Sequence, residues 1–206
     1  GTDGPVALRP SQLVEPEAEF VLQAKARFVS RGGIKLENAL DALGIDVTDR
    51  DCLDVGASTG GFTDCMLQRG AARVAAVDVA YGQIDARLRK DPRVIVIERL
   101  NARALGPADL PFLASLATVD VSFISLTKVL PAVAACLVPG GDVLAMVKPQ
   151  FELGRERVGR GVVRDAADRQ EAVLKVALAA RETGLQVSGI ASSGLPGPKG
   201  NSETFV

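Results

Sequence analysis

The sequence predicts a doubly wound α/β domain whose sheet has seven mostly parallel strands. Short apolar runs rich in β-branched residues alternate with stretches of helical periodicity, the order found in sheets covered by helices on both faces. Most of these runs are apolar along nearly their whole length, as expected for parallel strands buried on both sides. The length of 206 residues suits one domain with a sizeable core, with or without a small appendage.

The first predicted helix begins near residue 34, in "IKLENALDALG". Its apolar residues share one helical face, and Gly44 is a suitable residue just beyond its end. Lys35 lies off the apolar face. The residues of that face are Leu36, Ala39, Leu40 and Leu43.

Strands and helices then alternate along the rest of the chain. Five buried parallel strands are expected at 52–56, 73–79, 94–98, 117–123 and 142–148. Helices are expected near 61–69, 82–90, 109–116, 126–137 and 166–183, the last with Asp165 as its N-cap. Two final strands are expected at 185–193 and in the closing "ETFV".

Composition excludes several kinds of chemistry. The chain has no histidine, which excludes serine–histidine catalysis and the common histidine-containing metal sites. Cys52, Cys65 and Cys136 are far apart with no CxxC spacing, so we expect no metal site and reduced, buried thiols in a cytoplasmic protein. No secretion signal or membrane-spanning run is visible. The net charge of −1 requires any nucleic-acid partner to bind a local basic patch.

The glycine-rich stretch "LDVGASTGGFT" follows the first predicted strand. Gly56, Gly60 and Gly61 give the spacing G-x-x-x-G-G, which lacks the middle glycine of a dinucleotide-binding turn. The Walker lysine is absent too. Asp54, at the strand end, instead suits a loop facing the positively charged S-adenosylmethionine, and the glycines permit close approach of the backbone.

Polar residues at the next two strand ends strengthen this interpretation. Asp78 is placed to accept hydrogen bonds from ribose hydroxyls, and the amide of Asn101 could bind the adenine edge. Each residue alone could be a structural turn or cap residue. Their occurrence at consecutive strand ends favours a nucleoside-binding site.

The fourth and fifth predicted strands end in "TVDVSFIS" and "MVKPQFE". Asp120 and Lys148 should therefore face one crevice, where an ammonium after an apolar strand needs a carboxylate partner. A purely structural ion pair is the alternative. Lys35 and Glu203, taken alone, are typical of surface residues.

A basic, glycine-rich loop, "GRERVGRGVVR", follows the strand that ends at Lys148. Such a loop beside an active site suits RNA phosphates, although most charge runs are simply solvated. The expected RNA-binding residues are Arg31, Arg155, Arg157, Arg160, Arg164 and Lys199.

Several stretches together resemble one known family. "RFVSRGGIKLENAL", "LDVGASTGGFTD", "VDVAYGQID", "ERLNAR", "VDVSFISL", "MVKPQFELGRERVGRGVVRD" and "GPKGNSE" occur in the order found in the hemolysin-A (TlyA) family of FtsJ/RrmJ-like ribosomal RNA 2′-O-methyltransferases. The resemblance covers about residues 25–206. It implies a class I S-adenosylmethionine-dependent methyltransferase fold with ribosomal RNA or ribosomal subunits as the partner.

The resemblance also implies residue roles and domain bounds. The family's Lys-Asp-Lys-Glu catalytic set falls on Lys35, Asp120, Lys148 and Glu203. Residues 1–29 would be the remnant of an S4-like RNA-binding domain with its linker, and 30–206 the methyltransferase domain. "ARFV" and "SETFV" depart from the family's pattern in the linker and after the asparagine. The expected cofactor residues are Asp54, Gly56, Ser58, Gly60, Gly61, Phe62, Asp78, Val79, Asn101 and Asp120.

Alternatives remain open at this point. Lys148 acts either as a neutral base that accepts the hydroxyl proton or as a cation that orients the oxygen. Other functions to weigh are methylation of a small molecule, membrane lysis, and cofactor binding without activity because the RNA-binding domain is mostly missing. Lysis is disfavoured because the chain has no strongly amphipathic cationic helix.

Overall fold

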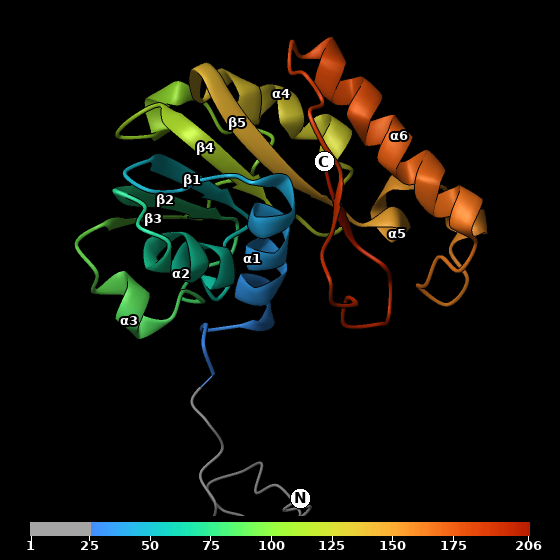
Figure 1. Ribbon diagram of the computed structural model, residues 1–206, viewed down its shortest axis with the longest axis horizontal. Helices are drawn as coiled ribbons and strands as arrows, with labels where there is room; N and C mark the ends of the chain where they lie inside the picture. Colours follow the sequence, from blue (N-terminus) through green and yellow to red (C-terminus); the bar gives the residue numbers. More distant parts are fainter. Residues whose placement is uncertain (1–25) are drawn as a thin grey trace, which may run out of the picture.

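Seven strands form one open sheet in the computed structural model, which describes residues 26–206 (Figure 1). Their order is β3-β2-β1-β4-β5-β7-β6. β1 to β5 are parallel, β7 is antiparallel to β5, and β6 is antiparallel to β7, which confirms the expected mostly parallel sheet. The strands are β1 Asp51–Val55, β2 Arg73–Asp78, β3 Val94–Glu98, β4 Ala114–Val119, β5 Leu137–Val147, β6 Ala191–Ser192 and β7 Thr204–Phe205.

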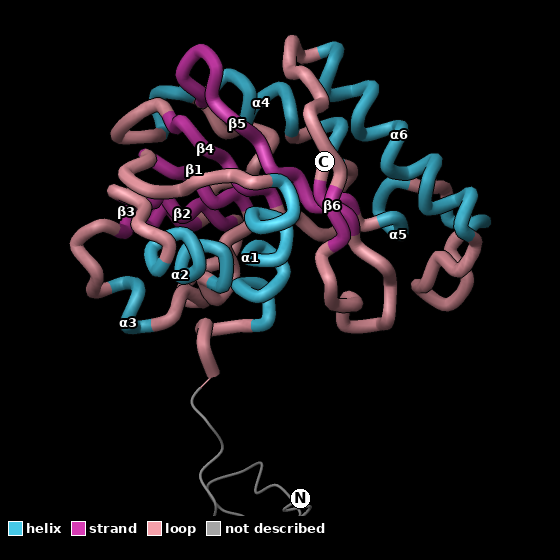
Figure 2. Tube along the Cα trace, in the orientation of Figure 1, coloured by secondary structure: helices cyan, strands magenta, loops and turns pink. Residues whose placement is uncertain are grey.

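Helices cover both faces of this sheet (Figure 2). α1 and α2 pack together on one face, and α4 and α6 lie on the other. Short 3₁₀ turns occur at 107–109, 126–128 and 155–157. The helices are α1 Arg31–Leu43, α2 Gly61–Gln68, α3 Ala86–Arg89, α4 Leu130–Ala135, α5 Pro149–Glu152 and α6 Ala166–Glu182.

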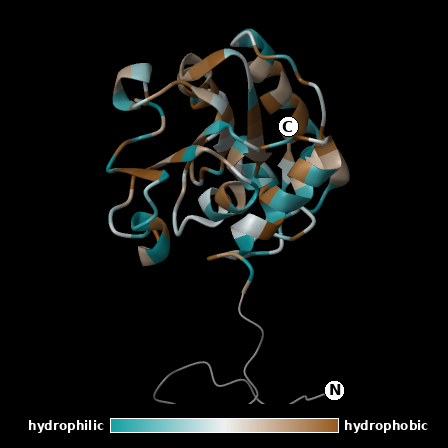
Figure 3. Cartoon of the chain, turned by 60° about the vertical axis from the view of Figure 1, so that its left-hand side comes forward, coloured by the Kyte–Doolittle hydropathy of each residue, from teal (hydrophilic) through white to brown (hydrophobic). Residues whose placement is uncertain are grey.

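The alternation of side chains along each strand creates two hydrophobic cores. In β2, Val74 and Ala76 join the core beneath α1 and α2, whereas Ala75 and Val77 join the core beneath α4 and α6. Much of the central sheet is brown in Figure 3, the colour of hydrophobic residues. Burial on both faces explains why these strands are recognisable as continuous apolar runs.

The predicted ends of two helices are confirmed. Gly44 follows α1 in the left-handed conformation, with φ of 65°. Asp165 caps α6 because its carboxylate accepts hydrogen bonds from the backbone of Ala167 and Asp168 at 2.7 and 3.1 Å. α2 and α6 also lie within one residue of their expected ranges.

Three predicted helices are wrong in extent. The expected helix at 109–116 is replaced by a 3₁₀ turn and the start of β4, since Pro111 cannot donate a helical hydrogen bond and the following apolar residues pair in the sheet. The helix expected at 82–90 is only α3, which begins after its N-cap, Asp85. The helix expected at 126–137 divides into a 3₁₀ turn and α4, and β5 begins already at Leu137.

The C-terminal strands are shorter than expected. Only Ala191–Ser192 of the predicted strand at 185–193 pairs, and Val187 and Ile190 are exposed. Only Thr204–Phe205 of "ETFV" forms a strand. Such short strands at a sheet edge have little periodic signal. The predicted RNA-binding remnant at 1–29 lies, up to residue 25, outside the described residues.

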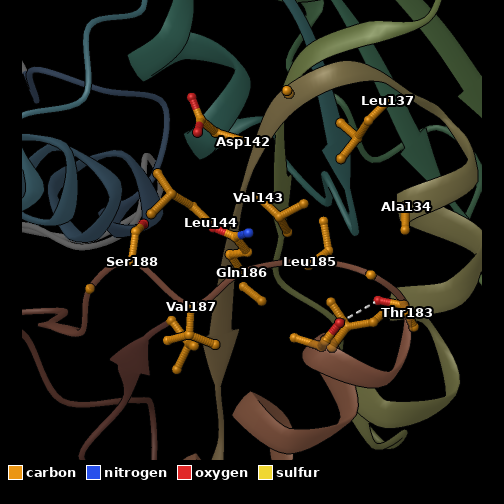
Figure 4. Close-up of a pocket in the computed structure, with 18 of the residues that line it drawn as sticks. Ala134, Leu137, Asp142, Val143, Leu144, Thr183, Leu185, Gln186, Val187 and Ser188 are labelled. Carbon is orange, nitrogen blue, oxygen red and sulfur yellow. Dashed lines mark hydrogen bonds between the residues drawn. The ribbon is translucent and has the colours of Figure 1, made fainter.

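A cleft of about 830 Å³ lies at the amino-terminal end of β5, beside the end of α6 and residues 185–189 (Figure 4). No predicted catalytic or cofactor residue lines it. Within the described part of the chain, no helix is long and apolar enough to cross a membrane.

Candidate active site

Parallel strands bring their carboxyl ends to one edge of the sheet, where ligands bind in open α/β folds. β1 leads into the glycine-rich turn, β2 ends at Asp78, and Asp120 and Lys148 directly follow β4 and β5. The predicted catalytic and cofactor residues from these strands therefore share one edge.

Two glycines shape the turn after β1. Gly56 and Gly60 have φ of 87° and 94°, a conformation that side chains rarely adopt. A Cβ atom at Gly56 would lie 2.4 Å from the carbonyl oxygen of Asp120. A Cβ atom at Gly60 would lie 2.3 Å from Leu88 Cδ1. Both positions thus require glycine, and the backbone of the turn lies close against the residue that follows β4.

The carboxylate of Asp54 faces inward rather than into the crevice. Its side chain is fully buried and accepts hydrogen bonds from the backbone and hydroxyl of Thr63, at 2.9 and 2.7 Å. Burial, together with the negative charge of Asp120, raises the pKa of Asp54 to about 7, although hydrogen bonds from Thr63 and Thr118 oppose the shift. Asp54 therefore holds the start of α2 beneath the turn, which agrees with the alternative that it is a structural cap residue.

The raised pKa of Asp54 predicts a pH-dependent stability. The folded state binds this proton up to about pH 7, whereas the unfolded state releases it near 3.8, so ionisation makes folding less favourable as pH rises between these values. Asp54→Asn removes this slope. We expect its free energy of unfolding, relative to wild type, to increase by a few kcal/mol from pH 4 to 7 and to level off above, since one pKa unit corresponds to about 1.4 kcal/mol.

Urea denaturation at each pH measures this difference. Asp49→Asn is the matched control, because it removes an exposed carboxylate at a left-handed position that asparagine tolerates. A difference between Asp54→Asn and wild type that stays constant over this pH range would contradict the prediction.

The end of β2 presents a carboxylate at the edge of the crevice. Asp78 is partly exposed and accepts hydrogen bonds from the backbone N–H groups of Ser58 and Ala80, both at 2.7 Å. These bonds connect the glycine-rich turn to β2. Val79 next to it is 67% exposed, which leaves an apolar side chain at the mouth of the site. Asn101, after β3, is also exposed, and its side-chain oxygen accepts from Arg103 N at 3.0 Å.

Two of the predicted cofactor residues lie in the core instead. Phe62 is 3% exposed, and its ring centroid lies 5.8 Å from that of Phe205. A Cβ atom at Gly61 would lie 2.1 Å from Ser30 Oγ, so this glycine permits close packing of α2 against the start of α1. Both residues support the glycine-rich turn through core packing at the start of α2.

The expected ion pair at the ends of β4 and β5 is confirmed. Lys148 Nζ lies 2.5 Å from Asp120 Oδ1 and donates a 3.0 Å hydrogen bond to Ser122 Oγ. The two charged side chains are 12% and 25% exposed, so they are shielded but reachable. The ammonium is held in place while one side of the pair opens to solvent.

Lys35 and Glu203 form a second, deeper ion pair, although the sequence alone suggested surface positions. Lys35 is 7% and Glu203 2% exposed, and the ammonium donates to the carboxylate. β7 pairs with β5 through Thr204 and Val147, so continuing the antiparallel register places Glu203 beside Lys148. The structure thus brings together all four residues of the predicted catalytic set.

An exposed aromatic residue near Lys148 was missed by the sequence analysis. Phe123 is 91% exposed, with φ of 64°, and its ring centroid lies 5.1 Å from that of Phe151. Phe123 follows Ser122, and Phe151 lies three residues after Lys148. The only available signal was an aromatic residue between two serines in the turn "VSFIS".

The predicted RNA-binding arginines differ in their surroundings. Arg157 is paired with Asp168 and Glu171 of α6, at 2.6 Å from Glu171, and these carboxylates raise its pKa. Arg157 therefore attaches the loop to α6, and its charge is already compensated. Arg160 and Arg164 are exposed.

The remaining predicted RNA contacts come from three different segments of the chain. Lys199 is exposed, and Arg31 donates a 3.1 Å hydrogen bond to the carbonyl of Pro196. Arg155 begins the 3₁₀ turn at 155–157. Lys199 lies beside the basic loop, because a Cβ atom at Gly161 would lie 3.3 Å from its side chain.

The fold is that of a class I S-adenosylmethionine-dependent methyltransferase. A methyltransferase of this class from Mesorhizobium loti superimposes with a TM-score of 0.56 at 16% identity, over 78% of this chain and 85% of that one. The family model of FtsJ-like methyltransferases matches residues 28–206. The chain therefore belongs to the FtsJ-like methyltransferase family.

More similar proteins agree with this assignment. The 16S/23S rRNA (cytidine-2′-O)-methyltransferase TlyA of Mycobacterium tuberculosis is 48% identical over 207 residues, which cover 99% of this chain and 77% of that protein. The crystal structure of a candidate hemolysin from Lactococcus lactis is 45% identical, with a TM-score of 0.86 over 88% of each chain. The resemblance found in the sequence is confirmed.

Proposed function

We propose that this methyltransferase moves a methyl group from S-adenosylmethionine to the 2′-hydroxyl of a cytidine ribose in ribosomal RNA. The observation that carries the proposal is the convergence of two lysine–carboxylate pairs, Lys148–Asp120 and Lys35–Glu203, at the edge where β4, β5 and β7 meet. The name of the relative from M. tuberculosis, which specifies cytidine-2′-O chemistry on 16S and 23S rRNA, supports the same substrate.

The crevice beside these pairs fits the cofactor. Gly56 and Gly60 place no side chain at two positions of the turn. Asp78 provides a carboxylate suited to ribose hydroxyls, and Val79 offers apolar surface for a purine. When bound, S-adenosylmethionine supplies an electrophilic methyl group on a sulfonium. The backbone of Asp120 lies against Gly56, so Asp120 borders the part of the turn where that positive charge would lie.

Lys148 is the residue best placed to act on the attacking hydroxyl. Asp120 and Ser122 fix its ammonium at the end of β5, and alignment of the attacking oxygen with the methyl carbon accounts for much of the catalysis. Lys148 then either accepts the hydroxyl proton or stabilises the negative charge that develops on oxygen. Lys35 and Glu203 support this geometry from below the site.

The exposed ring of Phe123 suits the base of the target nucleotide. Phe123 presents a solvated ring beside Ser122, which contacts Lys148, so a base stacked on it would place its ribose near the ammonium. Arg160 and Arg164 would contact flanking phosphates.

Phe123→Ala is expected to raise the KM for RNA about tenfold, since stacking of one base on an aromatic ring is worth about 1–3 kcal/mol. The affinity for S-adenosylmethionine should not change, because Phe123 is not part of the glycine-rich turn. Phe123→Trp keeps a stacking surface and should stay within about threefold of the wild-type KM. Steady-state methyl transfer measures both variants. An unchanged KM in Phe123→Ala would exclude the stacking role.

Labelled methyl transfer to isolated small and large ribosomal subunits tests the proposed function. We expect incorporation into RNA of at least one subunit, and none when the RNA already carries the 2′-O-methyl group. Release of dye from liposomes, with no methyl transfer to either subunit, would favour the lytic function instead. A separate comparison tests residues 1–29 as the remnant of an RNA-binding domain. It measures methyl transfer by this chain and by a longer chain.

The proposal places the protein in the cytoplasm, where ribosomal RNA is found. Cys52, Cys65 and Cys136 are buried free thiols, which agrees with a reducing compartment.

A further inference from the structure

Asn201 has no assigned role in the chemistry above, yet its side chain is one of the most buried polar groups of the described chain, with an exposure of 2%. It lies in the turn between Gly197 and Glu203. Its amide nitrogen donates to the carbonyl of Gly161 at 2.8 Å, and its amide oxygen accepts from Val163 N at 2.9 Å. Both partners belong to the basic loop, about 40 residues earlier in the sequence.

The partners of Asn201 lie in a tight turn and in the stem that follows it, and this segment carries Arg160 and Arg164. Val162 N donates to the Gly159 carbonyl at 3.0 Å, and Arg160 and Gly161 have φ of 50° and 83°. Two consecutive left-handed residues are typical of a type I′ turn, with Arg160 near its tip. Val163 is 2% exposed, so the stem is anchored in the protein while Arg160 and Arg164 point into solvent.

The other side of Asn201 leads to the catalytic set. The carbonyl of Asn201 accepts from Gly197 N at 2.8 Å, which closes the turn, and Glu203 follows two residues later. Glu203 binds Lys35, and a Cβ atom at Gly197 would lie 2.4 Å from its carboxylate. The turn that carries Asn201 is therefore packed directly on Glu203.

We propose that Asn201 is a positioning residue that fixes the turn at 159–162 relative to Glu203. RNA bound by Arg160 and Arg164 then has its target ribose aligned with the methyl-transfer site. This inference rests on the proposed function. A buried amide that satisfies one N–H and one C=O of another loop makes a rigid, directional connection, because either partner left unsatisfied would be costly.

The test is a double-mutant cycle on the KM for the ribosomal subunit that accepts the methyl group. We expect Asn201→Ala to raise this KM about tenfold, similar to the combined change Arg160→Ala and Arg164→Ala. Because Asn201 acts through the arginines, the triple variant should lie within about twofold of the arginine double variant. The affinity for S-adenosylmethionine, measured by calorimetry, should be unchanged in all three.

Asn38→Ala is the matched control. Asn38 also holds the C-terminal segment, through a 3.0 Å hydrogen bond to the Ser193 carbonyl, but in the described structure it makes no hydrogen bond to the basic loop. Asn38→Ala should lower the midpoint temperature of thermal unfolding without raising the KM for RNA. If Asn201→Ala does not fold, Asn201→Asp keeps an acceptor for Val163 N and loses the bond to Gly161, and should give an intermediate KM.

The outcomes separate the two proposals. A triple variant whose KM rises by the product of the separate factors would overturn the positioning role, as would a wild-type KM in a folded Asn201→Ala variant. If the wild-type chain itself transfers no methyl group, the proposed function has failed and this inference fails with it.

Discussion

Lys148→Ala is expected to lower kcat for methyl transfer to RNA by about a thousandfold, within the range of about 10²–10⁴ for loss of a positioned acid or base. The loss follows from geometry, because Lys148 is held by Asp120 and Ser122 at the end of β5, where the acceptor oxygen should lie. The proposed cofactor site lies mainly on the turns that follow β1 and β2, away from Lys148. Calorimetry should therefore find the affinity for S-adenosylmethionine within about threefold of wild type.

Two further variants make this result specific. Lys90→Ala removes an exposed lysine at the end of α3 and controls for the loss of a positive charge. Lys148→Arg keeps the charge but cannot act as a neutral base. Partial activity in Lys148→Arg would identify Lys148 as a cation that orients the oxygen, and complete loss would identify it as the base. Normal turnover in Lys148→Ala would remove Lys148 from the catalytic set.

Changes to the buried pair Lys35–Glu203 are expected to produce the largest losses of stability. Lys35→Met leaves the carboxylate of Glu203 buried without its partner, which should lower the free energy of unfolding by about 3–5 kcal/mol. Glu203→Gln should also be destabilising, because the buried ammonium of Lys35 loses its counter-charge. Urea denaturation measures both losses.

The double variant Lys35→Met with Glu203→Gln distinguishes a structural pair from a catalytic one. It contains no unpaired charge at this position, so its stability should return to within about 1–2 kcal/mol of wild type. Methyl transfer should stay low in all three variants, because the charges near Lys148 are still missing. A stable double variant with normal activity would show that the pair only stabilises the fold.

The central sheet was predictable because its strands are buried on both faces. β1 to β4 are recognisable as apolar runs, and Asp120 and Lys148 could be paired because parallel strands end at one edge. The extents of the helices expected at 82–90, 109–116 and 126–137 were not predictable, because prolines and turns interrupt these segments. The edge strands β6 and β7 have only two residues each, too few for a periodic pattern.

The parts of the site that were missed depend on contacts between distant residues. Arg157 resembled its neighbours in sequence, and only the position of α6 shows that Asp168 and Glu171 compensate its charge. The inward orientation of Asp54 depends on Thr63, nine residues later. The burial of Lys35 and Glu203, separated by 168 positions, arises only when β7 folds against β5.

Analysis of the modified nucleoside tests the central claim most directly. RNA from a ribosomal subunit methylated by the wild-type chain is digested to nucleosides, and the methylated product is fragmented in a mass spectrometer. The account predicts that the methyl group leaves with the ribose, as 2′-O-methylcytidine, and that Lys148→Ala yields none. A methyl group that stays on the base would contradict it.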